Sequence, residues 1–272
     1  KMNRYEKNKK LLSENHNYDQ SMEHDACGVG LIATTDGKKS RKIVEYGIEA
    51  LKAIWHRGAV DADGKSGDGA GIQIEIATEF FKEKIINTGH DLDNTKRICV
   101  GMVFLPRTDY VEQEKCREII ESVLLEENYS IYGWRQVPFN SNVLGKTAEQ
   151  SRPEIAQVMF KKNENLETND LERNLFETRK KIEKLARKNQ LKNFYICSFS
   201  SRSIVYKGMF LAEMLAEFYP DLNDKKLTSR FVIFHQRYST NTFPSWDLAQ
   251  PFRTLAHNGE INTLKGNINW MK

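Results

Sequence analysis

Short apolar runs recur along most of the chain, and the way they are grouped with helical segments most constrains the fold. The run CGVGLIA at 27–33 ends at the Asp36-Gly37 turn signal, and Ile72, Ile74 and Ile76 alternate as in a half-buried strand. Further strands are predicted at 98–105, 130–137, 155–160, 194–199, 203–206 and 231–238, and helices at 43–57, 110–127, 171–189 and 209–218. The strands and helices do not follow the strict alternation of βαβ units, so the sequence predicts an α+β layered fold.

Composition excludes several classes of protein. The 272 residues are 39% hydrophobic and 29% charged, as is typical of a soluble globular protein, and Lys plus Arg exceed Asp plus Glu by only 41 to 37. This balance does not indicate a nucleic-acid partner. No apolar run approaches the ~20 residues of a membrane span, so no membrane partner is predicted. Residues 1–26 are polar and lack the apolar core of a secretory signal, so we interpret them as a tail that precedes a domain at 27–272.

The four cysteines lie far apart, and no two of them form a C-x-x-C pair. This spacing indicates free thiols in a reducing, cytoplasmic environment, with no metal site in this chain. Cys27 differs from the others because Gly28 and Gly30 follow it at the head of a predicted strand. Little side-chain bulk would surround its sulfur, so the thiol would be open to approach. The alternative interpretation is that Cys27 is a small buried apolar residue.

A second segment of interest runs from His56 through a predicted loop at 61–71 that is rich in glycine and aspartate. Arg57 lies at a predicted helix end, where its fork could pair both oxygens of a carboxylate, or simply face solvent. The same stretch matches a degenerate phosphate-loop pattern that ends at Lys65 and Ser66, which would make the chain a nucleotide-binding module. We reject this because a phosphate loop lies between a strand and a helix, whereas here a helix precedes and a strand follows. A calcium loop is rejected because Lys65 takes the place of an oxygen ligand.

The third segment spans 235–269 and contains HQRYST and AHNGE. Asn258-Gly259 is a turn dipeptide, and it is also a pair whose side-chain amide and backbone N–H could form an oxyanion hole. Arg237 and Thr240 are near enough in the sequence to contribute polar contacts to the same pocket.

Together these motifs resemble the class II, N-terminal-nucleophile glutamine amidotransferases, and within them the glutamate synthase branch. The matching blocks are EHDACGVG around Cys27, WHRGA around Arg57, SGDGAGI at 66–72, GWRQVP at 133–138 and the long closing block at 235–271. So many separated matches make coincidence an inadequate explanation.

The resemblance implies a four-layer αββα fold in which cleavage before Cys27 exposes this residue as an N-terminal nucleophile. It also implies that Arg57 shapes the pocket, that Arg237 binds the carboxylate of L-glutamine with Thr240 beside it, and that Asn258 and Gly259 form the oxyanion hole.

The resemblance further implies that this is a C-terminally incomplete domain of a longer polypeptide. Its partners would be the remaining synthase domains and a small electron-donating subunit, with FMN and an iron-sulfur cluster in the full-length enzyme. The electron donor, NADPH, NADH or ferredoxin, stays open. The alternatives are a different class II amidotransferase and an inactive, uncleaved fragment.

Overall fold

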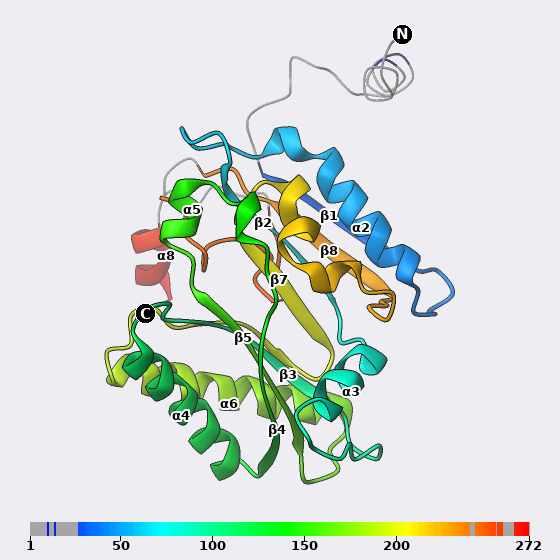
Figure 1. Cartoon of the computed structure of the whole chain (residues 1–272), viewed down its shortest axis with the longest axis vertical. Coiled ribbons are helices and arrows are strands. Elements are labelled where there is room, and N and C mark those ends of the chain that lie inside the picture. Colours follow the sequence, from blue (N-terminus) through cyan, green and yellow to red (C-terminus); the bar gives the residue numbers. More distant parts are fainter. Residues whose placement is uncertain are drawn as a thin grey trace.

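The computed structural model describes residues 27–239, 243–253, 255–257 and 264–271, together with Lys10 and Glu14. The chain alternates irregularly between strands and helices (Figure 1). In chain order the elements are β1 (Gly28–Ala33), α2 (Arg41–Ala53), β2 (Ser66–Glu75), α3 (Thr78–Ile86), β3 (Cys99–Leu105), α4 (Tyr110–Glu126), β4 (Tyr129–Gln136), α5 (Lys146–Gln150), β5 (Glu154–Lys162), α6 (Thr168–Lys188), β6 (Tyr195–Ser200), β7 (Ser203–Phe210), α7 (Leu215–Phe218), β8 (Phe231–Gln236) and α8 (Leu264–Trp270).

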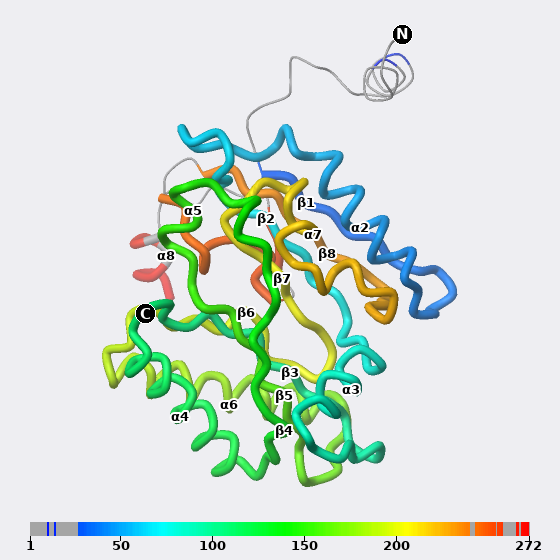
Figure 2. The backbone as a smooth tube through the Cα atoms, in the orientation of Figure 1, coloured from blue at the N-terminus to red at the C-terminus, as the bar shows by residue number. Residues whose placement is uncertain are grey.

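The strands form two antiparallel sheets. The first has the order β1-β8-β2-β7 and the second the order β4-β5-β3-β6. The chain begins in the first sheet, builds the whole second sheet, and then returns through β7 and β8 (Figure 2). Because of this return, β8 comes to lie between β1 and β2 although it follows them by more than 150 residues. The predicted α+β class agrees with this architecture.

Each sheet is covered by helices on one side. Helix α2 packs on β1 and β8, and its buried residues include Val44 and Leu51. Helices α4 and α6 pack on each other and on the second sheet, on the side away from α2 (Figure 1). Two of these helices begin where a side chain caps them, since Ser40 accepts from the Lys42 N–H and Asp109 accepts from the Glu112 N–H.

Strand β3 shows how the second sheet separates two buried cores. Val100, Met102 and Phe104 belong to the core that also contains the α2 and β2 side chains. The alternate residues Val103 and Leu105 belong to a second core, made with apolar side chains of α4 and α6. Because successive strand residues point to opposite faces, β3 needs apolar residues throughout, and all seven of its residues are buried.

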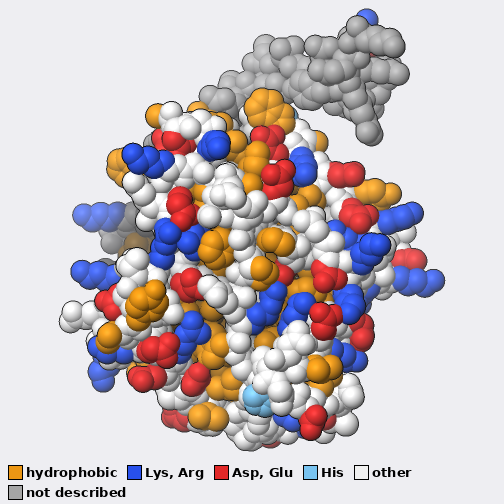
Figure 3. All heavy atoms as spheres, in the orientation of Figure 1, with side chains coloured by type: hydrophobic (Ala, Val, Ile, Leu, Met, Phe, Trp, Pro, Cys, Tyr) orange, Lys and Arg blue, Asp and Glu red, His pale blue; other side chains and the backbone are white. Residues whose placement is uncertain are grey.

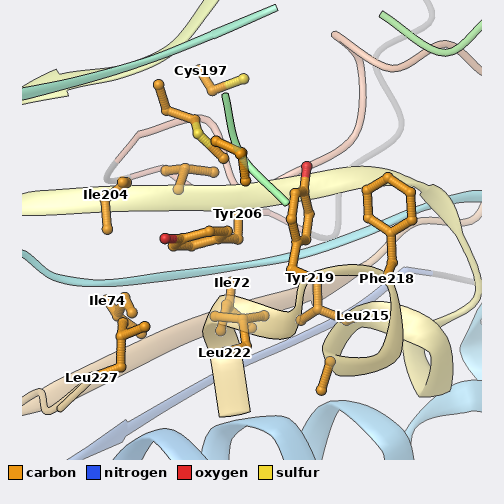
Figure 4. Close-up of a cluster of buried hydrophobic side chains, with 14 of the residues drawn as sticks. Ile72, Ile74, Cys197, Ile204, Tyr206, Leu215, Phe218, Tyr219, Leu222 and Leu227 are labelled. Atoms are coloured by element: carbon orange, nitrogen blue, oxygen red, sulfur yellow. The ribbon is translucent and has the colours of Figure 1, made fainter. Parts of the chain in front are cut away.

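A cluster of large side chains packs against one face of the first sheet. Ile72 pairs with Tyr206, and Ile74 with Ile204, so these four side chains share one face of β2 and β7. Ile204 and Tyr206 point to the side of β7 where α7 lies, whereas Cys197 lies on the other side of this strand (Figure 4). Both faces of β7 are therefore buried, as its uniform burial also indicates.

The structure corrects the predicted loop at 61–71. Strand β2 already begins at Ser66 and has ten buried residues. A side chain at Gly67 would lie 2.7 Å from the Phe210 carbonyl oxygen, and one at Gly71 would lie 2.5 Å from the Gln250 carbonyl oxygen. The glycines of β2 therefore allow neighbouring backbone segments to approach this strand closely. The high glycine content of the stretch had instead suggested a loop.

The helix predicted at 209–218 is also wrong in its first part. Strand β7 continues to Phe210, and only a short 3-10 turn at Ala212–Met214 and α7 follow. Met209 and Phe210 are buried as the last residues of β7, and Phe210 pairs with Ser66 of β2, which a local pattern does not reveal. The short helices α3 and α5 were not predicted.

The surface carries charges of both signs. Lys and Arg side chains are interspersed with Asp and Glu side chains over the face shown in Figure 3. Among the described helices, none combines the length and the apolarity that crossing a bilayer requires.

A pair of aliphatic substitutions tests this account of the core. Ile72 has no exposed surface, so Ile72→Ala should lower the free energy of unfolding by about 2–5 kcal/mol through lost burial and a cavity. Leu31 lies in the same sheet but is 65% exposed, so Leu31→Ala should change the free energy of unfolding by less than about 1 kcal/mol. Urea denaturation of both variants measures the difference, and equal losses would contradict the assignment of Ile72 to the core.

Candidate functional site

Three strand ends meet around Cys27. Cys27 directly precedes β1, and the adjacent Gly28 pairs with Gln236, the last residue of β8. Gln236 also pairs with Ala70 near the start of β2. Beyond the strand, the Arg237 N–H continues the ladder by donating to the Gly69 carbonyl at 2.8 Å. The start of β1, the start of β2 and the end of β8 therefore lie at the same edge of the first sheet.

The sulfur of Cys27 is held against the backbone of Tyr238. The Tyr238 N–H donates to Cys27 Sγ at 3.3 Å, and the thiol lies 3.5 Å from the Tyr238 carbonyl oxygen, which can accept from it. An N–H donor aimed at sulfur stabilises a thiolate, which is the nucleophilic form of cysteine. This contact joins residues 211 positions apart in the chain.

Cys27 also differs from the other cysteines in exposure. It is half-buried, whereas Cys99, Cys116 and Cys197 are buried. Burial raises the pKa of Cys116 and Cys197 to about 12 and that of Cys99 higher still. At neutral pH those three thiols are held in the inert protonated form, so Cys27 is the one positioned for nucleophilic chemistry.

The turn that carries Arg57 packs against β1 next to Cys27, because two glycines leave room for it. It ends the 3-10 turn Trp55–Arg57 that follows α2. A side chain at Gly28 would lie 3.2 Å from Arg57 Cβ, and one at Gly58 would lie 2.2 Å from Gln236 Nε2. Because neither glycine has a side chain, the turn that carries Arg57 can lie directly against β1 and β8.

Arg237 is a buried cation at the end of β8. It is 8% exposed, and burial lowers the pKa of its guanidinium while the neighbouring Asp68 and Cys27 act to raise it. Its Nη1 donates to the Asp68 carbonyl oxygen at 3.4 Å. Two arginines, Arg57 and Arg237, thus lie close to Cys27, and a positively charged guanidinium there suits a carboxylate ligand.

Asp68 is a buried carboxylate that was not singled out from the sequence. It is 8% exposed, and its Oδ2 accepts from the Ser239 N–H at 2.5 Å. Burial raises the pKa of Asp68, while the Ser239 N–H and Arg237 oppose this shift. Its signal in the sequence is an acidic residue between Gly67 and Gly69, a pattern that we interpreted only as part of a loop.

His235 and Gln250 hold the backbone of His257. His235 Nε2 lies 2.8 Å from the His257 carbonyl oxygen and must be its donor, and the His257 N–H donates to Gln250 Oε1 at 3.2 Å. His235 has no exposed surface, and burial lowers its pKa to about 4. His235 is therefore neutral at pH 7, with its proton on Nε2. The residues predicted to form the oxyanion hole, Asn258 and Gly259, follow His257 directly.

Not every site residue predicted from the sequence can be located. Cys27, Arg57 and Arg237 are brought together at one edge of the first sheet. Thr240, Asn258 and Gly259 lie outside the described residues. The contributions of Asp68, His235 and the Tyr238 amide were missed, because each depends on contacts between segments that are distant in the chain.

The phosphate-loop pattern serves another purpose in the structure. Asp63 accepts from the backbone N–H groups of Lys65 and Ser66 at 3.0 and 2.7 Å, and from the Ser66 hydroxyl at 2.6 Å. These bonds, chiefly those from Ser66, hold the pKa of Asp63 well below its usual range. The Asp63 carboxylate thus accepts from the backbone N–H groups that would bind a phosphate in a phosphate loop. Ser66 also begins a strand instead of a helix.

A separate cavity of about 460 Å³ is lined by Phe104, Arg152 and Trp246, among others. None of Cys27, Arg57, Asp68 and Arg237 lines it. We place the candidate site at Cys27, because the accessible thiol and the buried charges meet there.

Comparisons with known proteins agree on the family to which these motifs belong. The sequence model of the family described as class-II glutamine amidotransferases matches residues 27–272. The chain is 56% identical over 265 residues to the large chain of NADPH glutamate synthase from Azospirillum brasilense, a match that covers 97% of this chain and 17% of that protein.

Ferredoxin-dependent glutamate synthases are also similar. The protein of Pyropia yezoensis is 48% identical over 253 residues, and the ferredoxin-dependent glutamate synthase 2 of Synechocystis sp. is 46% identical over 250 residues. Each match covers 92% of this chain and 16% of the relative. The chain therefore spans about a sixth of the length of these proteins.

The burial of neutral His235 predicts a pH dependence of stability. The pKa of His235 is about 4 in the folded protein and about 6.5 in an unfolded chain, so the unfolded state binds the proton more tightly. The contribution is fully present above about pH 6.5 and is lost as the pH falls towards 4, by about 1.4 kcal/mol per pH unit. His235→Gln keeps an N–H donor for His257 but does not titrate. The free energy of unfolding, followed from pH 7 to pH 4, should therefore fall less steeply for this variant, and parallel curves would contradict the assignment.

Proposed function

Because this chain belongs to the class-II glutamine amidotransferases, we propose that it hydrolyses L-glutamine with Cys27 as nucleophile. Cys27 attacks the side-chain amide, and glutamate and ammonia are the products. The observation that carries this proposal is the half-buried Cys27, whose sulfur receives the Tyr238 N–H at the edge where three strands end. No other cysteine of the chain is similarly accessible.

The residues around Cys27 support defined roles in this reaction. Arg237 binds the α-carboxylate of glutamine, with Thr240 beside it, and Arg57 shapes the pocket next to the nucleophile. Asn258 and the Gly259 N–H stabilise the oxyanion that forms on the amide oxygen. The support for Arg57 and Arg237 is their position beside Cys27. The roles of Thr240, Asn258 and Gly259 rest on the family motifs alone.

The proton transfer follows from the chemistry of an N-terminal cysteine. Cleavage between residues 26 and 27 frees the α-amine of Cys27, whose pKa of about 7.7–8.0 is close to the value of about 8.5 for a thiol. The amine accepts the thiol proton, directly or through a water, and the thiolate attacks the amide carbon. The amine returns the proton as ammonia leaves. Water then hydrolyses the thioester to glutamate and restores Cys27. Residues 1–26 are thus a propeptide-like tail, and residues 27–272 belong to the amidotransferase domain.

We further propose the four-layer αββα arrangement of N-terminal-nucleophile hydrolases for this domain. Its support is the position of α2 on the first sheet, of α4 and α6 on the second, and the burial of both faces of β3 and β7. Cys27 then directly precedes β1, an outer strand of the first sheet.

In the longer polypeptide, we propose that the ammonia is passed to a synthase domain that acts on 2-oxoglutarate. FMN and an iron-sulfur cluster would serve that synthase domain. Among the described residues of this chain, no group of three or more His, Cys, Asp or Glu side chains could hold a metal ion. The identity of the electron donor stays open. A small electron-donating subunit, a cytoplasmic location and the lack of nucleic-acid or membrane partners stay predictions.

Replacement of the nucleophile tests the proposed function. In the full-length enzyme, Cys27→Ala should abolish glutamine-dependent glutamate synthesis and leave ammonia-dependent synthesis unchanged, because only the release of ammonia needs the thiol. Cys197→Ala, which removes a buried thiol, is the control and should keep glutamine-dependent synthesis. Both activities are measured as 2-oxoglutarate-dependent formation of glutamate. Retained glutamine-dependent synthesis in Cys27→Ala would refute the proposal.

The carboxylate-binding role of Arg237 has its own test. Arg237→Lys keeps the charge but loses the two-pronged geometry, so KM for glutamine should rise about tenfold or more, the effect of one lost charged hydrogen bond. Arg230→Lys makes the same change at the opposite end of β8, where Arg230 pairs with Glu75, and should leave KM unchanged. Steady-state kinetics with glutamine as the varied substrate measure both. An unchanged KM in Arg237→Lys would remove Arg237 from the glutamine site.

A further inference from the structure

We propose that Asp68 is a positioning residue for this reaction. It holds the segment after β8 in place, so that the Tyr238 N–H points at Cys27 Sγ and Arg237 stays next to Cys27. The inference rests on the proposed function of Cys27 and Arg237. It adds a residue that contacts neither substrate nor reacting sulfur but acts through the two residues that do.

The contacts of Asp68 and Gly69 bracket Tyr238. The Asp68 carboxylate accepts from the Ser239 N–H at 2.5 Å, and the Asp68 carbonyl accepts from Arg237 Nη1 at 3.4 Å. The Gly69 carbonyl accepts from the Arg237 N–H at 2.8 Å. Both chain neighbours of Tyr238 are therefore fastened to the start of β2, which fixes the direction of the Tyr238 N–H that lies 3.3 Å from Cys27 Sγ.

The charge of Asp68 matters as well as its hydrogen bond. Asp68 and Arg237 are each only 8% exposed, and a buried cation is stable only when an opposite charge or hydrogen bonds compensate it. Asp68 is the strongest favourable charge acting on Arg237. A substrate carboxylate that binds Arg237 would thus meet a guanidinium that Asp68 has already placed.

A bulge in β2 turns Asp68 towards this position. The pairing of β2 with β7 changes register between Ser66 and Ala70, so Asp68 leaves the regular ladder. Gly69 has a φ of +132°, a conformation that favours glycine, and a side chain there would lie 2.8 Å from Ala249 Cβ. The glycines on both sides of Asp68 therefore allow the bulge that directs its carboxylate at Ser239.

Two substitutions separate the hydrogen bond from the charge. Asp68→Asn keeps an oxygen that can accept from Ser239 but loses the charge, and Asp68→Ala loses both. In the full-length, processed enzyme, Asp68→Ala should lower kcat/KM for glutamine by about 100-fold and Asp68→Asn by about tenfold, as expected for lost charged hydrogen bonds. Asp61→Asn is the matched control, because Asp61 also acts electrostatically on Asp68, whereas among the described residues its side chain accepts only from the neighbouring Ala62 N–H. It should change kcat/KM by less than about twofold, the usual effect of an exposed charge.

Two further measurements distinguish positioning from a general structural role. Ammonia-dependent synthesis should stay unchanged in both Asp68 variants. Alkylation of Cys27 by iodoacetamide without glutamine should be slower in Asp68→Ala than in the unaltered enzyme, because the Tyr238 N–H no longer stabilises the thiolate. Parallel loss of ammonia-dependent synthesis, or unchanged alkylation and kcat/KM, would overturn the role of Asp68. Neither result touches the proposed function, which fails only if Cys27→Ala retains glutamine-dependent synthesis.

Discussion

The pairing of β8 with both β1 and β2 is the constraint on which the candidate site depends. Without β8, the start of β1 and the start of β2 would have no common neighbour, since the two strands do not pair with each other. Gln236 meets Gly28 on one side and Ala70 on the other, and Arg237 and Tyr238 continue from there to Asp68 and Cys27. Backbone hydrogen bonds thus bring together a thiol, a carboxylate and a guanidinium.

Buried polar groups also hold residues of the segment that follows β8 in place by hydrogen bonds. Lys207 has no exposed surface, and it donates to the carbonyl oxygens of Asp247 and Ala249 at 2.7 and 2.6 Å. Burial lowers its pKa to about 8. Gln250 and His235 then hold His257 from its two sides. These contacts link residues 247, 249 and 257 to β7 and β8.

Glycines decide how closely the site can be assembled. Gly28 and Gly58 leave no room for a side chain between Arg57, Ile54 and Gln236, and Gly71 lies against the Gln250 carbonyl. A β-carbon at any of these positions would separate elements that carry the site. Gly71 and the other glycines of the stretch at 61–71 made that stretch look like a loop, although its second half is a buried strand. Their role is close approach of neighbouring segments, which composition does not distinguish from flexibility.

Local patterns and family motifs by themselves predicted most elements and the candidate nucleophile. The alternation of Ile72, Ile74 and Ile76, the apolar run after Cys27 and the family blocks around Cys27, Arg57 and Arg237 were all legible in the sequence, because they reflect spacing within one segment or motifs within one family. The period of a strand, however, says nothing about which strand will be its neighbour or in which register. Only the tertiary structure decided that Asp68 meets Ser239, 171 residues away, and that the Tyr238 N–H meets Cys27 Sγ, 211 residues away. These contacts arise from strand pairing across the whole chain, and their physical cause is the burial of polar groups that must find partners where the strands end.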